Sequence, residues 1–169
     1  MNTVSLILIC FFFVRIITIF ISIKNEQRIK KSGAVEHGKL NSLLLTLAHV
    51  AVYGGSFYEA YTNNVEFNLY SKIGLCIMIF SYLMLFYVMY ALREVWTVKI
   101  FIVPNHKVVK SFLFRAVRHP NYFLNVIPEI IGVTLLCNAW KTMMFVLPVY
   151  LVILIIRIYQ EEKAMKGML

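Results

Sequence analysis

Long apolar stretches dominate this sequence, and they restrict the folds open to it. Each is close to the roughly 20 residues that a helix needs to cross the hydrocarbon core of a bilayer. Hydrophobic residues make up 60% of the 169 positions and charged residues 15%, whereas soluble domains average about 45–50% and about 25%. A backbone in lipid must satisfy its own hydrogen bonds, so each stretch predicts a helix. We therefore predict an all-α integral membrane protein with about five transmembrane helices, at 4–23, 40–61, 68–92, 121–137 and 143–159.

Several other classes of protein are excluded by what the sequence lacks. Its seven glycines never form the phosphate-binding patterns of dinucleotide-binding or P-loop domains. Cys10, Cys76 and Cys137 lie far apart in apolar stretches, so we expect buried, reduced thiols and no metal site. The net charge of +9 comes from basic residues between the apolar stretches rather than from a soluble basic face, so we expect no nucleic-acid partner.

The positive charge indicates an orientation in the membrane. Fourteen of the 17 lysines and arginines fall in 24–39, in 93–120 or in the tail from Arg157 onwards. Because cytoplasmic loops carry the excess of positive charge, we expect these segments on the cytoplasmic face and the amino terminus outside. The first stretch has no basic residue before it and no small-residue cleavage site after it, so we expect it to be retained.

The last two stretches are joined by only a few residues around 138–142. They predict a tight helical hairpin whose open ends both face the cytoplasm, so the end of 93–120 should lie beside the tail 157–169. We expect a single transmembrane domain over residues 1–169, with its chemistry in about 93–169.

One polar cluster opens the fourth stretch, in the sequence Arg118-His119-Pro120-Asn121-Tyr122. Proline suits the first position of a helix, and the free N–H groups there suit an anionic ligand group. Arg118 and His119 add side-chain donors. The alternative is an interfacial anchor, because arginine, histidine and tyrosine are common at the level of lipid headgroups.

A second polar cluster lies near the end of the chain. Arg157 and Glu161 are four residues apart and share a helical face, with Glu162 one step around. Two carboxylates could receive an ammonium group while the arginine holds an acid. The alternative is a solvated helix end with a simple ion pair, but the predicted hairpin brings this cluster against His119.

Together, the two clusters resemble the isoprenylcysteine carboxyl methyltransferase family, whose R-H-P-x-Y…E-E pattern is shared with phospholipid N-methyltransferases. The resemblance covers about residues 93–165 and includes Trp96-Thr97-Val98-Lys99 and Val108-Val109-Lys110-Ser111. The segment 24–38 further resembles a bacterial branch that includes alkylpyrone O-methyltransferases. Two departures concern the backbone around the cofactor: Phe123 and Phe112-Leu113-Phe114 stand where the family usually has glycine-containing sequence.

The resemblance implies S-adenosylmethionine as methyl donor, bound without a Rossmann domain at the cytoplasmic ends of the last two helices. Arg157 and Glu162 match positions that face the methyl-accepting group, with Arg157 orienting an anion and Glu162 fixing the guanidinium. The implied cofactor-binding residues are Arg118, His119, Pro120, Tyr122 and Glu161.

We therefore interpret the chain as a membrane-embedded O-methyltransferase dependent on S-adenosylmethionine. The acceptor would be a carboxylate or hydroxyl oxygen of a lipid-like molecule, of either the isoprenylcysteine type or an alkylated polyketide. Its partners would be this acceptor and membrane lipids. One alternative is a phospholipid N-methyltransferase, whose amine Arg157 would repel and Glu162 would attract. The other is a non-enzymatic membrane subunit that binds a partner protein or anionic lipid.

Polar residues inside the stretches complete the prediction. Ionisable groups within a membrane mark a functional site or a buried pair. Arg15 and Glu129 lie at similar depth below the cytoplasmic face, so we predict that they are in contact. Pro128 should free the Leu124 carbonyl and bend its helix. On the second stretch, we interpret Thr46, His49 and Tyr53 as a face that forms hydrogen bonds between helices.

Overall fold

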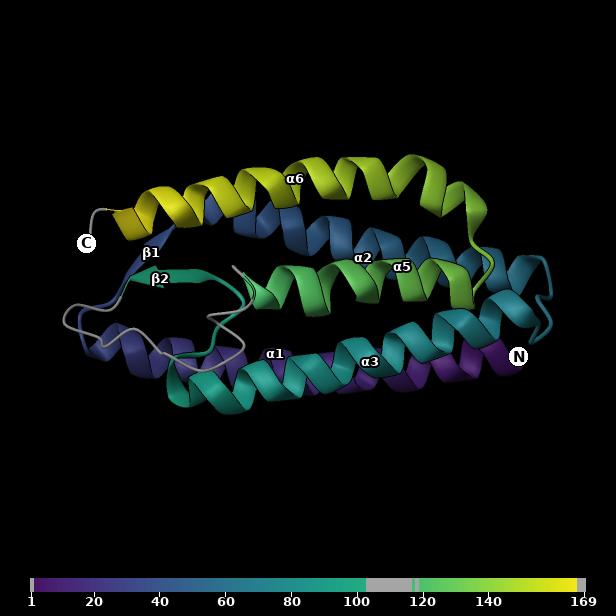
Figure 1. Cartoon of the computed structure of the whole chain (residues 1–169), viewed down its shortest axis with the longest axis horizontal. Helices are drawn as coiled ribbons and strands as arrows, with labels where there is room; N and C mark the ends of the chain where they lie inside the picture. The colour runs from purple at the N-terminus through teal and green to yellow at the C-terminus, as the bar shows by residue number, and fades with distance from the viewer. Residues whose placement is uncertain (1, 103–116, 118, 167–169) are drawn as a thin grey trace.

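The computed structural model describes residues 2–102, 117 and 119–166, with side chains described up to residue 164 (Figure 1). The helices run along one long axis, and the two termini lie at opposite ends of the bundle. A π-helical segment, η2 (Asn121–Val126), leads directly into α5 (Ile127–Leu136). The long helices are α1 (Thr3–Lys31), α2 (Lys39–Thr62), α3 (Leu69–Leu92) and α6 (Trp140–Lys166).

The prediction of an all-α membrane protein is confirmed. The helices α1, α2, α3 and α6 are long and apolar enough to cross a bilayer. The fourth predicted stretch forms a shorter apolar helix, Asn121–Leu136. Its 16 residues span at most about 24 Å at 1.5 Å per residue, against about 30 Å for a hydrocarbon core. Figure 1 shows that the shortfall is at the amino-terminal end of this helix, which stops short of the ends of α1 and α6 on the same side.

The helix α1 extends beyond the predicted end of the first stretch at residue 23. It continues to Lys31 with Arg28, Lys30 and Lys31 in its last turn, where positive charge interacts favourably with the helix dipole. Its first turn is capped by the Asn2 side chain, which accepts a hydrogen bond from the Ser5 N–H at 2.9 Å. About half of the first basic segment is thus helical rather than loop.

A small antiparallel sheet forms at the end of the bundle where α6 ends, and it was not predicted from the sequence (Figure 1). It pairs β1 (Val35–His37) with β2 (Ile100–Ile102), with Glu36 opposite Phe101. After β1 the chain turns into α2 through Gly38, whose φ of 64° favours glycine. A side chain at Gly38 would also collide with Gln160 of α6. The sheet therefore holds the loop after α3 beside the start of α2, and both lie next to the end of α6.

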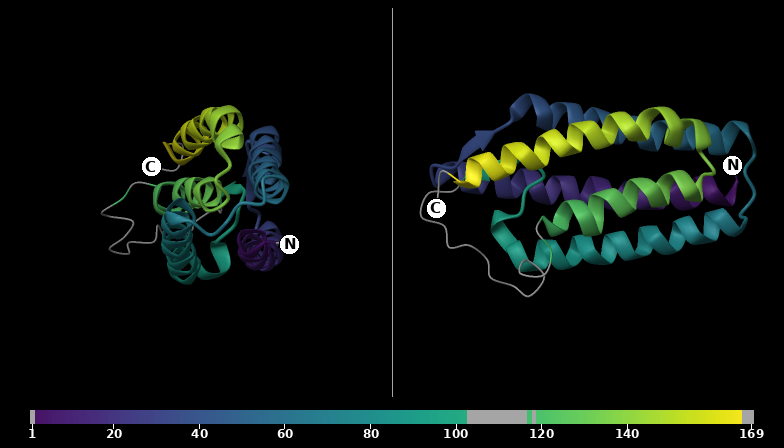
Figure 2. Two further views of the ribbon diagram at one scale, coloured as in Figure 1. Left: turned by 90° about the vertical axis from the view of Figure 1, so that its right-hand side faces the viewer. Right: turned by 45° about the horizontal axis from the view of Figure 1, so that its top comes forward.

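The closest helix packing is between α3 and α5. A Cβ atom at Gly74 would collide with the backbone of Leu136, and one at Gly132 would lie 3.0 Å from the Gly74 carbonyl oxygen. Small residues allow helix backbones to approach closely where lipid provides no hydrophobic drive for association. The end-on view in Figure 2 shows α5 between α3 on one side and α2 and α6 on the other.

The predicted tight hairpin is present, since only Cys137–Ala139 separates α5 from α6. Asn138 makes the turn with φ of 49°, a left-handed conformation that asparagine tolerates. The two helices do not pack mainly on each other, because α6 lies along α2 and α5 along α3. Glu59 of α2 caps the start of α6, accepting hydrogen bonds from the N–H groups of Lys141 at 3.1 Å and Thr142 at 2.6 Å.

The outer surface of the bundle is apolar, as a lipid-facing surface should be. Phe20, Phe145 and Ile155 are each more than 60% exposed. Cys10 and Cys76 also face outwards, so the expectation that all three thiols are buried is wrong for these two. Cys137 is buried, and all three cysteines are free. Cysteine in an apolar stretch of a membrane helix can face lipid as readily as the core.

The predicted contact between Arg15 and Glu129 is confirmed, with 3.3 Å from the Arg15 guanidinium to the Glu129 carboxylate. Pro128 lies in the first turn of α5. The turn before it is π-helical, and the Ile127 N–H donates to the Tyr122 carbonyl five residues earlier. The missing N–H of Pro128 is therefore accommodated by a wider turn, a feature that often marks functional sites.

Candidate functional site

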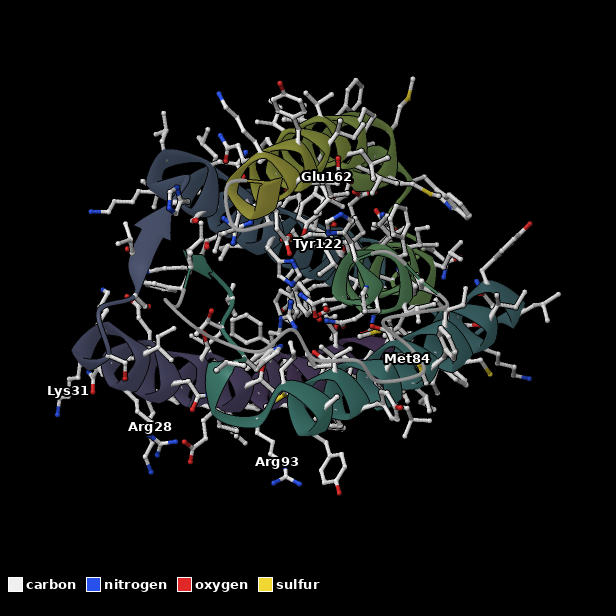
Figure 3. The ribbon with its side chains drawn as sticks, turned by 60° about the vertical axis from the view of Figure 1, so that its left-hand side comes forward. Arg28, Lys31, Met84, Arg93, Tyr122 and Glu162 are labelled. Carbon is white, nitrogen blue, oxygen red and sulfur yellow. The ribbon has the colours of Figure 1, made fainter. Side chains whose placement is uncertain are left out.

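A polar site lies at the end of the bundle where the sheet, the end of α6 and the start of η2 meet. Figure 3 looks toward this end, with Glu162 labelled on α6 and Tyr122 on η2, while Arg28 and Lys31 project outwards at the edge. The site draws together two segments about 40 residues apart in sequence, as the hairpin predicts. We call the set His119, Tyr122, Arg157, Glu161 and Glu162 the rim site.

His119 lies between the two adjacent carboxylates of α6. Its Nδ1 is 3.6 Å from Glu161 and its Nε2 is 3.3 Å from Glu162. The pKa of His119 is raised above its ordinary value, chiefly by the Glu161 carboxylate and also by Glu162. Partial burial of the ring opposes this shift but does not cancel it. The two carboxylates therefore favour an imidazolium ion at this position.

The backbone at His119 is strained, because its φ of 57° is unusual for a residue other than glycine. The His119 carbonyl accepts hydrogen bonds from the N–H groups of Tyr122 at 3.0 Å and Phe123 at 3.3 Å. Pro120, which is buried, immediately precedes the helix with φ of −60°. Such strain persists only where the surroundings enforce it, and it is common at functional sites.

Arg157 is buried on α6, with 1% of its surface exposed. Its guanidinium donates three hydrogen bonds, to the Tyr122 hydroxyl at 3.3 Å, the Ser42 hydroxyl at 2.6 Å and the Val98 carbonyl at 2.7 Å. These partners come from η2, α2 and the loop after α3, and all three are neutral. None of the glutamates in the described residues forms an ion pair with Arg157.

The loop that supplies the Val98 carbonyl is itself fixed by α1. Asn25 donates to the Trp96 carbonyl at 2.9 Å, and Ser22 accepts from the Val98 N–H at 2.8 Å. Lys99 forms an ion pair with Glu26 at 3.0 Å. The end of α1 therefore positions the backbone group that holds Arg157.

The structure brings together most of the predicted site residues, but the contacts of Glu162 differ from those predicted. Glu162 contacts His119, whereas Tyr122, Ser42 and Val98 hold the Arg157 guanidinium, so the predicted Glu162–Arg157 pairing is not observed. The sequence contained no signal for Ser42 or Val98, because their contribution depends on how α2 and the loop pack against α6.

Some sequence predictions concern other positions. Arg118 and Phe112-Leu113-Phe114 lie outside the described residues. Phe123, where the family usually has glycine, is 48% exposed and so faces away from the buried rim site. Across the residues that the structure describes, no group of three or more histidine, cysteine or acidic side chains could hold a metal ion.

The fold and the rim site define an integral membrane protein with an ionised site at one end of its helical bundle. A model of the isoprenylcysteine carboxyl methyltransferase family matches residues 73–167, a longer segment than the 93–165 covered by the motif resemblance. The chain therefore belongs to the isoprenylcysteine carboxyl methyltransferase family, a family of membrane methyltransferases.

Two bacterial relatives extend the similarity over most of the chain. An uncharacterized protein of Haemophilus influenzae is 53% identical over 156 residues, which cover 92% of this chain and 91% of that protein. The uncharacterized protein YpbQ of Bacillus subtilis is 30% identical over 144 residues, which cover 85% of this chain and 84% of that protein. No solved structure matches the chain. The relatives' names leave the acceptor open, so it has to be inferred from the site.

Proposed function

We propose that this protein transfers the methyl group of S-adenosylmethionine to an oxygen anion of a lipid-like acceptor at the rim site. The observation that carries the proposal is the buried guanidinium of Arg157, whose three described partners are neutral. A buried charge is costly unless an opposite charge or strong hydrogen bonds compensate it. An anionic acceptor would supply that charge during the reaction.

Arg157 has further donors for such an acceptor. A guanidinium has five N–H donors, and the described residues engage three of them. The remaining two suit a carboxylate or an ionised hydroxyl, since arginine forms strong charge-assisted hydrogen bonds with oxygen anions. Ser42, Tyr122 and the Val98 carbonyl would hold the guanidinium still while it orients the acceptor.

The acidic half of the rim site fits the methyl donor. Glu161 Oε2 is buried, faces the His119 Nδ1 at 3.6 Å and makes no hydrogen bond among the described residues, so it could also accept from an ammonium group such as that of the methionine moiety. His119, Pro120, Tyr122 and Glu161 would line this part of the site, with Arg118 a further candidate. When bound, S-adenosylmethionine would supply a methyl group on a positively charged sulfur.

The residues would then act by positioning and by excluding water. A carboxylate or acidic enol is already ionised near neutral pH, so no side chain has to serve as a base. Alignment of donor and acceptor in near-attack geometry can supply about 7–11 kcal/mol of the barrier in favourable cases. Burial of Arg157 and Tyr122 keeps water from the oxygen anion that the guanidinium holds.

The position of the rim site supports a lipid-like acceptor and a cytoplasmic active site. The site lies at the end of the bundle that carries Arg28, Lys31 and Arg93 on its surface (Figure 3). The excess of positive charge on cytoplasmic segments favours this end as the cytoplasmic one. An amphiphile could enter from the bilayer with its headgroup at the rim, while the water-soluble donor enters from the cytosol.

The alternatives fit the site less well. A phospholipid amine would bring a positive charge toward the Arg157 guanidinium, which would repel it. A non-enzymatic subunit would need neither the strained backbone at His119 nor a buried arginine whose described partners are all neutral. Among oxygen acceptors, an isoprenylcysteine-type carboxylate and an alkylated polyketide hydroxyl both suit Arg157, and the resemblance of segment 24–38 to alkylpyrone O-methyltransferases favours the polyketide.

Two measurements test the proposal. Calorimetry of the purified protein in detergent should show saturable binding of S-adenosylmethionine, and membranes given labelled methyl donor should accumulate labelled lipid, identified by mass analysis. Arg157→Ala should abolish labelling and leave donor binding largely intact. Arg28→Ala is the matched control, because Arg28 is a half-exposed arginine at the same end that pairs with Glu94. Saturable donor binding with labelling undiminished in Arg157→Ala would refute the role of Arg157, and absence of donor binding would refute the proposed function.

A further inference from the structure

A second buried polar cluster lies deeper in the bundle than the rim site. We call Arg15, His49, Tyr53, Tyr82, Glu129 and Tyr150 the deep cluster. Glu129 is completely buried at its centre, and its Oε1 accepts a hydrogen bond from the Tyr53 hydroxyl at 2.7 Å and lies 3.3 Å from that of Tyr82. Its Oε2 faces Arg15. The five helices α1, α2, α3, α5 and α6 each contribute at least one residue.

His49 connects the cluster to α6. Its Nε2 lies 3.4 Å from Glu129, and its Nδ1 forms a hydrogen bond with the Tyr150 hydroxyl at 3.1 Å. The His49 ring also stacks on the Tyr53 ring, with 5.3 Å between centroids. His49 therefore joins α2, α5 and α6 through one side chain.

The deep cluster and the hydrogen bonds of Arg157 involve the same three parts of the bundle, and the same number of residues separates the two layers in each part. On α2 Ser42 lies seven residues before His49, and on α6 Tyr150 lies seven residues before Arg157. Seven residues are about two helical turns, so each pair shares a face about 10 Å apart. Tyr122 and Glu129 are also seven apart, across the π-helical turn of η2. Two layers of polar contacts thus join α2, α5 and α6.

We infer that the deep cluster is a positioning layer for Arg157. The His49–Tyr150 bond fixes how far α6 lies along α2, and the His49–Glu129 contact fixes α5 against both. That register determines whether Arg157 can reach Ser42 on one side and Tyr122 on the other. The catalytic consequence rests on the proposed function, but the positional relation itself does not.

The test measures the arginine directly. In protein labelled with ¹⁵N-arginine, each of the six arginines gives one Nε–H signal, and the signal lost in Arg157→Lys identifies Arg157. This N–H is buried and donates to Tyr122, so its exchange with solvent is slow in the parent protein. Neither methyl donor nor acceptor is needed, so failure of the methylation assay leaves this experiment decisive.

The main variant is Tyr150→Phe, which removes one hydroxyl and leaves every charge in place. We expect the Arg157 Nε–H to exchange roughly fivefold faster, the loosening that loss of one hydrogen bond produces. Thr134→Val is the matched control, because the buried Thr134 hydroxyl bonds only within α5 among the described residues, and it should leave exchange unchanged.

A second variant, Glu129→Gln, should also accelerate exchange, since it weakens the contact with His49. If it fails to fold, Tyr150→Phe still decides. Unchanged Arg157 exchange in folded Tyr150→Phe would overturn the inference and leave the deep cluster a purely structural feature. Equal acceleration in Thr134→Val would overturn it as well, because the effect would then be nonspecific.

Discussion

The rim site and the deep cluster both combine arginine, histidine and glutamate, yet their charges are arranged differently. In the deep cluster Glu129 is fully buried and faces Arg15 on one oxygen and His49 on the other. In the rim site Arg157 has neutral described partners, and the Glu161 side chain is 27% exposed. The deep cluster is closed and internally compensated. In the rim site both carboxylates face His119, so Arg157 is left with neutral partners among the described residues, as a site that receives an anionic ligand should be.

The two regions should therefore respond in different ways to mutation. Loss of a charge from a compensated buried cluster leaves its partner uncompensated, which is strongly destabilising. Loss of a charge from a ligand-binding site should reduce binding or turnover and change the free energy of unfolding less.

Glu129→Leu should have the largest effect on stability. It leaves Arg15 buried without its carboxylate, and removal of one partner of a buried pair costs about 3–5 kcal/mol. Thermal or denaturant unfolding in detergent would measure the change. The double variant Arg15→Met with Glu129→Leu should recover much of the loss, because it removes both charges. A double variant no more stable than Glu129→Leu would contradict charge compensation in the deep cluster.

Glu161→Gln should weaken binding of the methyl donor, with little change in the unfolding midpoint. Glu161 Oε2, which faces His119 and makes no hydrogen bond among the described residues, is the acceptor proposed for the donor's ammonium group. A hydrogen bond to a charged group contributes about 1.5–3 kcal/mol, so affinity should fall by about tenfold or more. Calorimetry with S-adenosylmethionine measures it, with Glu66→Gln as a control in the loop between α2 and α3. Unchanged affinity in Glu161→Gln would remove Glu161 from the proposed cofactor site.

Arg157→Met should destabilise the protein less than Glu129→Leu, because it removes a desolvated charge and leaves only neutral groups without their hydrogen bonds. Turnover should nevertheless be lost. The free energies of unfolding of Arg157→Met and Glu129→Leu, measured under the same conditions, compare the two regions directly. A loss as large as that of Glu129→Leu would mean that Arg157 is a structural residue.

The smallest effect concerns pH and His119. Its pKa is raised chiefly by Glu161, so its contribution to stability is fully present below the ordinary histidine pKa of about 6.5. That contribution is lost as pH rises through the raised pKa. An NMR titration of the His119 ring should give a pKa above the ordinary value, and Glu161→Gln should lower it. A His119 pKa that Glu161→Gln leaves unchanged would contradict the contact.

Much of the architecture follows from the sequence because membrane constraints are simple. Apolar length predicted the helices, and equal depth below one face predicted the Arg15–Glu129 pair. The short link at 138 predicted that His119 would meet Glu161 and Glu162. These inferences need only the direction of each helix and the rise per residue.

The remainder depended on packing that the sequence pattern does not specify. Ser42 and Val98 reach Arg157 because α6 lies along α2 rather than along α5, and no periodicity indicates that choice. The strands β1 and β2 are three residues each, too short for an alternating pattern. The role of Glu162 depended on its direction around α6, because both adjacent carboxylates face His119 and neither pairs with Arg157.

The hydrogen bond between Arg157 and Ser42 has a consequence for chimaeric proteins. Ser42 lies outside residues 73–167, the segment that matches the family model. An exchange of that segment between two homologues would transplant the arginine without the α2 hydroxyl that holds it. Junctions placed before residue 39 would keep both residues from one parent, so hybrids made there should inherit acceptor preference as a unit.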